Sequence, residues 1–197
     1  MIDPDKIPDP NFVVPDLTEA IEGWRAWRVK ATPPMYGTTP KLYSVSHSGY
    51  YWTPRRRSQA RCGNAPAGRC YMNPPGDIMG VSRLPGERCS CGFYTAGTLE
   101  HLLTMAYPGY HEESGEVCVI GRVANWGKVI ECATGWRSEF AYPVELFVPY
   151  ETWQLAKPLA HGYGVKVRLK NWLTEALDPA LRARMEKRQL GYQPNPT

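Results

Sequence analysis

Four of the six cysteines lie close together in the chain, in a stretch that is otherwise rich in glycine and proline: Cys62, Cys70, Cys89 and Cys91. Thiolates are ligands that a soft tetrahedral ion such as zinc prefers, and four of them complete its coordination shell. A loop of this length has little apolar material with which to hold itself in place. These features predict a structural zinc site within residues 62–91, with unligated thiols and disulfides as the alternatives.

No catalytic pattern accompanies these cysteines. The four histidines (His47, His101, His111 and His161) are scattered, and the sequence contains no HExxH, GxSxG or phosphate-binding glycine motif. A catalytic zinc keeps one coordination position open, whereas four thiolates favour a closed structural site. The sequence therefore predicts that the protein is not an enzyme. The remaining cysteines, Cys118 and Cys132, lie among apolar strand residues and are expected to be structural thiols.

A second polar group stands in the segment GWRSEFAYP, where Arg137 and Glu139 share one face of an expected strand. Residues in this arrangement form an ion pair with each other or bind a ligand together, and the ion pair is the favoured interpretation. If the sheet closes into a small barrel, Trp24, Trp126 and Arg137 near its mouth would suit a stacked base or a peptide side chain. The candidate binding site therefore comprises Trp24, Trp126, Arg137 and Glu139.

A basic cluster comprises Arg55, Arg56, Arg57 and Arg61. Guanidinium groups at this density can bind phosphates, so the cluster predicts nucleic-acid contact as an alternative function. A solvated surface loop is the other interpretation, because the net charge of the chain is only +4.

The alternation of apolar residues predicts strands at 23–29, 41–45, 117–123, 127–132, 140–148 and 165–169, with turns at 125–127 and 134–135. Gly121 within a strand predicts a bulge or a close approach of two backbones. Helices are expected at 98–106, with Thr98 as N-cap, and at 151–160 until Pro158 disturbs the second one. The expected fold is α+β: a curled, mostly antiparallel sheet forming a partial barrel, with a zinc-binding loop and peripheral helices.

A chain of 197 residues suits one main domain. The expected organisation is an extended or mobile arm (1–22), a β-rich domain (23–170), a C-terminal helical appendage (171–190) and a disordered tail (191–197). No apolar run approaches the roughly 20 residues that cross a bilayer, and no signal peptide is evident. The expected location is therefore the cytoplasm, without membrane association.

Five segments carry a resemblance: GWRAW, the CxCG at 89–92, VIGRVANWGKVIE, GWRSEFAYP and YGVKV. Together, over residues 23–167, they resemble a set of uncharacterised actinobacterial and actinophage proteins. The resemblance implies a strand-rich domain with a Cys/His metal knot and no known activity. Its members often place a histidine where this chain has Ser82, so Cys70 is the inferred substitute ligand, with water or His101 as alternatives.

The expected function is a non-catalytic, zinc-stabilised binding module that is phage-encoded and acts on a host protein. Seven tryptophans and twelve tyrosines supply more aromatic surface than a core of this size needs, and exposed aromatic side chains favour interfaces with other proteins. Nucleic-acid binding by the arginine cluster is the alternative.

Overall fold

The computed structural model describes residues 20–31, 39–47, 49–62, 70, 84–86, 89–105 and 115–170. Nearly all of the expected arm (1–22), much of the expected zinc-binding loop, the expected C-terminal helix (171–190) and the tail (191–197) lie outside these residues. The interpretations placed on them stay predictions.

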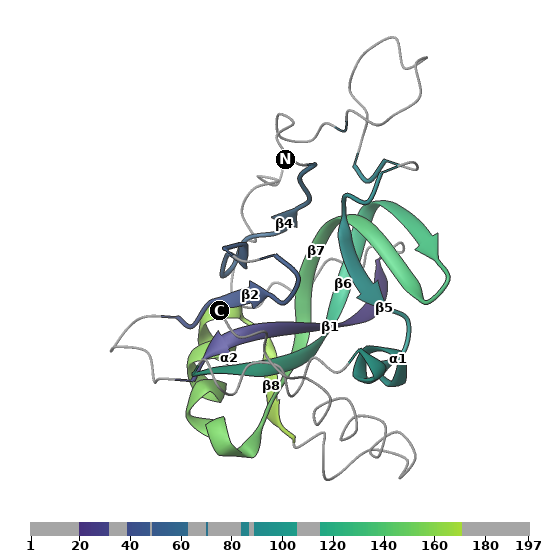
Figure 1. Ribbon diagram of the computed structural model, residues 1–197. Helices are drawn as coiled ribbons and strands as arrows, with labels where there is room; N and C mark the ends of the chain where they lie inside the picture. Colours follow the sequence, from purple (N-terminus) through teal and green to yellow (C-terminus); the bar gives the residue numbers. More distant parts are fainter. Residues whose placement is uncertain are drawn as a thin grey trace, which may run out of the picture.

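Three long antiparallel strands form the centre of the sheet: β1 (Ile21–Lys30), β6 (Glu116–Cys132) and β7 (Gly135–Val148). Strand β6 pairs with β1 along one edge and with β7 along the other, so it lies between these two strands in the sheet (Figure 1). The segments are rich in β-branched and aromatic residues, which favour a pleated, half-buried surface. The strands predicted at 23–29 and 140–148 are confirmed, and those predicted at 117–123 and 127–132 are both extended but belong to the single strand β6.

Strand β5 (Phe93–Ala96) closes part of this sheet into a ring. It pairs with β1 at Trp24↔Ala96 and with β7 from Phe93↔Ser138 to Ala96↔Gly135. The strands β1, β6, β7 and β5 are therefore each paired with the next, and the last returns to the first. This arrangement confirms the expected curled, mostly antiparallel sheet with a partial barrel.

Four short strands extend the sheet beyond the ring: β2 (Leu42–Ser44), β3 (Tyr51–Trp52), β4 (Ser58–Gln59) and β8 (Lys166–Leu169). Strand β2 joins β1, β3 joins β2, and β4 joins β7, all antiparallel. Strand β8 runs parallel to β7.

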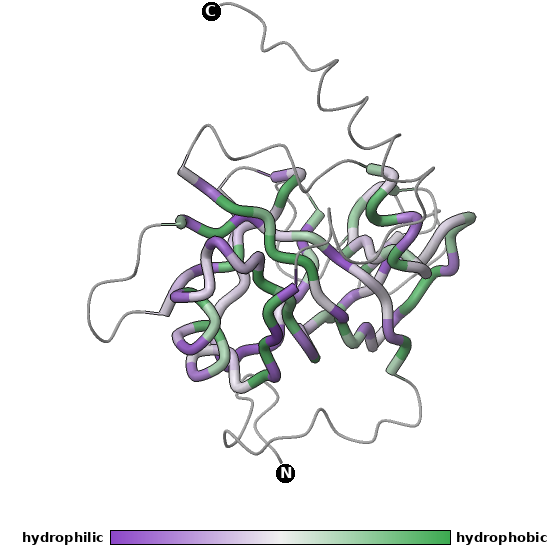
Figure 2. The backbone as a smooth tube through the Cα atoms, turned by 90° about the horizontal axis from the view of Figure 1, so that it is seen from below, coloured by the Kyte–Doolittle hydropathy of each residue, from purple (hydrophilic) through white to green (hydrophobic). Residues whose placement is uncertain are grey.

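Both faces of the sheet bury apolar side chains, because successive residues of a strand point to opposite sides. On β1, Trp27 and Val29 belong to a larger cluster, whereas Ala26 belongs to a smaller one that includes Leu102 and Leu103. Hydrophilic and hydrophobic residues accordingly alternate along the described chain, as the purple and green segments of Figure 2 show.

Within the described residues, three helical segments pack around the sheet: α1 (Leu99–Thr104), η3 (Tyr150–Leu155) and α2 (Ala156–Tyr163). Helix α1 begins as expected, since the Thr98 side chain accepts a hydrogen bond from the His101 N–H. Pro158 does not end the second helical segment, contrary to expectation. It is the third residue of α2, in the first turn, where a helix loses no internal hydrogen bond to proline. No helix in the described part of the chain is long and apolar enough to cross a bilayer.

The turn expected at 125–127 is wrong, because β6 continues through it. Asn125 is fully buried, its amide donates to the Ile21 carbonyl, and its side-chain oxygen accepts from Ser138. Gly127, at φ 75°, takes up a register shift between Trp126 and Val129. Asn125 and Gly127 suggested a turn from their residue types. In the structure, Asn125 is a buried amide whose hydrogen bonds are satisfied, and Gly127 lies in a β-bulge.

The close backbone approach expected at Gly121 is confirmed. A Cβ at this position would lie 2.3 Å from the Glu145 carbonyl oxygen of β7, so only glycine fits this strand crossing without displacement of the backbone.

Two buried tyrosines, Tyr142 of β7 and Tyr163 of α2, hold the segment that contains β2 and β3 against the core. The Tyr163 hydroxyl donates to the Trp52 carbonyl and accepts from the Leu42 N–H. The Tyr142 hydroxyl donates to the Tyr163 carbonyl and accepts from the Arg55 N–H. These bonds fix the polypeptide that leads toward Cys62.

Candidate metal centre

The structure brings the four predicted cysteines together. Their sulfur atoms all lie within 4.8 Å of one another. The Sγ–Sγ distance is 3.5 Å from Cys62 to Cys70 and from Cys62 to Cys89, and 3.8 Å from Cys70 to Cys91. We call these four residues the cysteine cluster.

The spacing fits a tetrahedral metal ion. With zinc–sulfur bonds of about 2.3 Å, the sulfur atoms of a tetrahedral site are about 3.8 Å apart. The four thiols carry no disulfide bond. Cys70 occupies the position expected of the substitute ligand, whereas His101 lies on α1 and is not part of the cluster. The donor set therefore suits zinc or another soft ion.

Residues 84–86 and 89–91, here called the knuckle, position two of the four sulfurs. The Gly86 N–H donates to Cys91 Sγ at 3.3 Å, and the Cys89 N–H donates to the Gly86 carbonyl at 3.2 Å. Leu84 is fully buried in the larger core cluster and anchors the knuckle to the sheet. Such a tight turn with N–H groups aimed at sulfur stabilises thiolates.

Arg137 holds the knuckle from the β7 side. Its guanidinium donates to the carbonyls of Cys89, Cys91 and Gly86, and the residue is only 6% exposed. The favoured ion pair with Glu139 is not present: the Glu139 carboxylate instead accepts the Lys128 N–H at 3.3 Å. These three carbonyl groups accept hydrogen bonds from the guanidinium in place of a carboxylate.

The cluster also sets the protonation of its own thiols. Burial raises the pKa of Cys62 to about 12 and raises that of Cys91. A hydrogen bond from the Cys91 N–H lowers the pKa of Cys89 to about 7. Of Cys62, Cys89 and Cys91, Cys89 therefore ionises most readily, and a metal ion must displace protons from Cys62 and Cys91. Four thiolates on a divalent ion carry a net charge of about −2, which the Arg137 cation partly offsets.

The other members of the candidate binding site do not meet. Trp24 stacks on Phe147 at 5.9 Å and packs against the smaller core cluster. Trp126 stacks on Phe140 at 6.0 Å and packs against the larger one. Because Arg137 is bonded into the knuckle, the expected common mouth for Trp24, Trp126 and Arg137 is wrong. The two tryptophans belong to different core clusters.

Two of the four arginines of the basic cluster make contacts within the domain. The Arg55 guanidinium donates to the His161 carbonyl at 2.7 Å, and that of Arg57 lies 4.3 Å from the centre of the Phe140 ring. Arg56 and Arg61 are exposed. Two of the four cations thus contribute to packing of the domain itself.

Cys118 is a buried thiol, as expected, and burial raises its pKa to about 12. Cys132 is half-buried at the other end of the same strand, β6.

Sequence reasoning missed the roles of Leu84, Gly86 and Arg137 in this centre. Backbone carbonyl groups receive the Arg137 hydrogen bonds, and every residue type carries one. For Leu84, which anchors the knuckle to the sheet, the available signal is that a leucine stands within a loop rich in glycine and proline.

Comparisons of the chain with protein-family models, with curated proteins and with solved structures find no match. The chemistry of the cysteine cluster is therefore the main guide to function.

Proposed function

We propose that the protein is a non-catalytic binding module whose knuckle is held to the sheet by one structural zinc ion. The observation that carries this proposal is the convergence of four cysteine sulfurs at the spacing of a tetrahedral tetrathiolate site.

The donor set supports a structural rather than a catalytic role. Four thiolates fill the coordination shell of zinc and leave no position for a substrate or a reactive water molecule. Cys70 and Cys91 are buried, and Arg137 fixes the backbone on one side of the site. A closed and rigid centre of this kind contributes folding free energy.

The partner we propose is another protein, which for a phage-encoded chain would be a protein of the host. Large aromatic side chains remain exposed on the described surface, among them Tyr94 at 50% and Trp153 at 66%. Such residues dominate protein interfaces. Nucleic-acid binding is the weaker candidate, because Arg55 and Arg57 make contacts within the domain.

Substitution of the metal by cobalt tests the proposal. The cobalt(II) protein should show the visible spectrum of a tetrahedral tetrathiolate, and azide should leave that spectrum unchanged because no coordination position is open. A spectrum that shifts on addition of azide would reveal an exchangeable position and would contradict the structural role.

A further inference from the structure

The four sulfurs of the cysteine cluster differ in their access to solvent. Cys70 and Cys91 are buried, with exposed fractions of 6% and 9%, whereas Cys62 and Cys89 are half-buried. The susceptibility of a cysteine to oxidation follows the exposure of its thiolate. A dissolved oxidant therefore meets Cys62 and Cys89 before it meets the other two.

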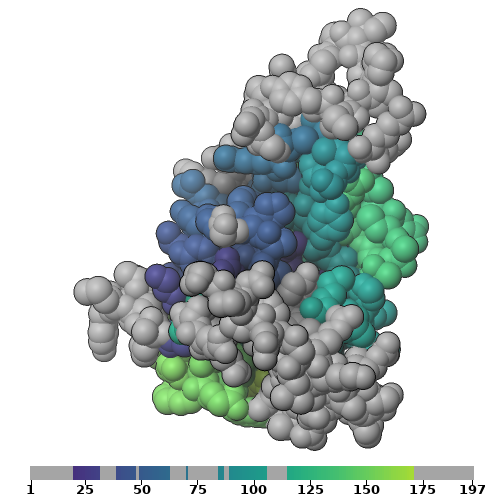
Figure 3. Space-filling view, viewed as in Figure 1, coloured from purple at the N-terminus to yellow at the C-terminus, as the bar shows by residue number. Residues whose placement is uncertain are grey.

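The two accessible sulfurs are also neighbours in space. The distance from Cys62 Sγ to Cys89 Sγ is 3.5 Å, although 27 residues separate them in the chain. In the space-filling view, residues of β3 and β4 in blue lie beside the residues of β5 in teal (Figure 3). The bond of a disulfide is about 2.0 Å long, so the two sulfurs need to approach by about 1.5 Å. Cys62 is equally close to Cys70, but Cys70 is buried.

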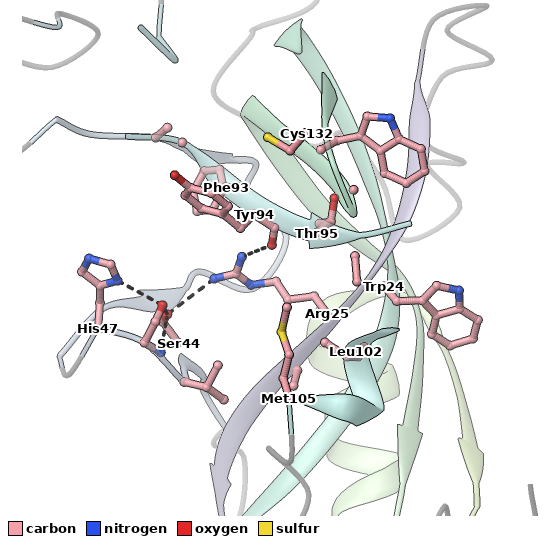
Figure 4. Close-up of a pocket in the computed structure, with 18 of the residues that line it drawn as sticks. Trp24, Arg25, Ser44, His47, Phe93, Tyr94, Thr95, Leu102, Met105 and Cys132 are labelled. Carbon is pink, nitrogen blue, oxygen red and sulfur yellow. Dashed lines mark hydrogen bonds between the residues drawn. The ribbon is translucent and has the colours of Figure 1, made fainter. Parts of the chain in front are cut away.

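The knuckle that carries Cys89 also places an exposed aromatic side chain. The Tyr94 hydroxyl donates to the carbonyl of Ser90, the residue between Cys89 and Cys91, at 2.8 Å. The Tyr94 carbonyl accepts from the Arg25 guanidinium at 2.5 Å, beside a cavity of about 640 Å³ (Figure 4). Tyr94 is one of the exposed aromatic residues assigned above to a protein interface. The state of the cysteine cluster therefore bears on the surface that a partner meets.

We propose that a hydroperoxide oxidises Cys62 and Cys89 to a reversible disulfide bond. One thiolate sulfur attacks a peroxide oxygen, the O–O bond breaks, and a sulfenic acid and hydroxide form. The second thiolate attacks the sulfenic sulfur, so that the S–S bond forms and a second hydroxide leaves. In total, two thiolates, one hydrogen peroxide molecule and two protons give one disulfide and two water molecules.

This oxidation removes two of the four proposed zinc ligands. Cys70 and Cys91 alone do not complete a tetrahedral coordination shell, so the disulfide form releases the metal ion. The knuckle then keeps the contacts of Leu84 and Arg137 but loses its metal bonds. The inference rests on the proposed structural zinc and names the chemical signal that controls it.

Treatment of the zinc-loaded, full-length protein with hydrogen peroxide tests the inference. Zinc release is followed with a coloured chelator against an untreated sample, and mass spectrometry of proteolytic peptides identifies the disulfide. We expect the loss of one zinc ion for each disulfide formed, and a bond that joins Cys62 to Cys89. A thiol reductant with added zinc should restore the metal-bound protein.

The matched control is Cys132→Ser. Cys132 is half-buried, as Cys62 and Cys89 are, and it lines the cavity beside Tyr94 but lies outside the cysteine cluster (Figure 4). This variant should release zinc at the same rate as the wild type. The identification of the disulfide is made on the wild type, so it needs no substitution at a metal ligand.

Three results would overturn the assignment: zinc release without a bond between Cys62 and Cys89, this bond with zinc retained, or slower release in Cys132→Ser. Zinc content before treatment separates the two proposals. A zinc-loaded protein whose cluster withstands peroxide, or oxidises only to sulfinic acids, refutes the oxidation site alone. A protein that contains no zinc but forms the bond between Cys62 and Cys89 refutes the metal centre and keeps the oxidation site.

Discussion

The sheet and the knuckle are stabilised by different means. In the sheet, β1, β6 and β7 bury large side chains such as Trp27 and Leu146 on a network of strand pairings. In the knuckle, one fully buried apolar side chain, Leu84, is joined by two of the four thiols of the cysteine cluster and by the three carbonyl groups that Arg137 contacts. Apolar burial is non-directional, whereas metal and hydrogen bonds are directional.

Because of this difference, the protein can place an irregular surface where directional bonds replace apolar burial. A segment rich in glycine and proline cannot bury enough apolar area to offset its conformational entropy. Directional bonds to the cysteine cluster allow such a segment to be held against the sheet. A cavity lies where the knuckle meets strand β5, and Ser90 and Phe93 are among the residues that line it. The two regions should therefore respond differently to substitution.

The largest expected effect separates a cysteine of the cluster from a cysteine of the sheet. Cys91→Ser should lower the free energy of unfolding by about 4 kcal/mol, roughly a quarter to a third of what four thiolates gain from zinc. Cys118→Ala removes only one buried sulfur from the sheet and should cost about 1 kcal/mol. Urea unfolding with and without a chelator measures both values. Similar losses in the two variants would show that the cluster adds nothing beyond packing.

The next effect concerns the hydrogen bonds of Arg137. Arg137→Gln should lower zinc affinity by about 10- to 100-fold, because groups that orient metal ligands have effects of this size. Glu139→Gln is the matched control on the same strand face, and its amide oxygen can still accept the Lys128 N–H. Competition with a coloured chelator gives both affinities. An affinity unchanged in Arg137→Gln would remove Arg137 from the metal centre.

A smaller effect is expected from the buried tyrosines, which lie on the sheet side of the comparison. Tyr163→Phe leaves the Trp52 carbonyl and the Leu42 N–H without this partner and should cost about 2 kcal/mol.

The same tyrosines predict a dependence on alkaline pH. Burial raises the pKa of Tyr142 to about 12 and also raises that of Tyr163. Since the unfolded value is about 10, their contribution is fully present below pH 10 and is lost as the pH rises toward the folded pKa. Urea unfolding between about pH 9 and pH 11.5 should show a decline that is shallower in Tyr163→Phe. If the free energy of unfolding declines equally with pH in the wild type and in Tyr163→Phe, groups other than Tyr163 cause the decline.

The smallest effect is expected at the surface of the sheet. Arg122 forms an ion pair with Glu22, and the two side chains are 40% and 44% exposed. Glu22→Gln should change stability by less than about 1 kcal/mol, and the change should vanish in high salt. A larger, salt-independent loss would mean that the sheet also depends on directional contacts.

The sequence predicted the parts of the molecule whose signals are local. Alternating apolar residues located β1 and β7, the Thr98 side chain located the start of α1, and cysteine spacing located the cluster. Each of these signals can be recognised from the residue types within one short stretch of the sequence.

The remaining features depend on contacts between distant segments. Asn125 has the residue type of a turn, and only its burial against Ile21 and Ser138 shows otherwise. Arg137 contacts carbonyl groups 46 and 51 residues away in the chain, at Cys91 and Gly86. The residues that line the cavity beside β1 and β5 come from several segments that lie far apart in the chain. No single sequence motif therefore predicts this cavity.

The most direct test of the metal centre is the metal content of the native protein, with thiols counted before and after chelation. We expect one zinc ion per chain and the release of four reactive thiols by the chelator, while Cys118 stays unreactive until the protein unfolds. A native protein without metal, in which the cluster thiols react before any chelator is added, would contradict the proposed structural zinc.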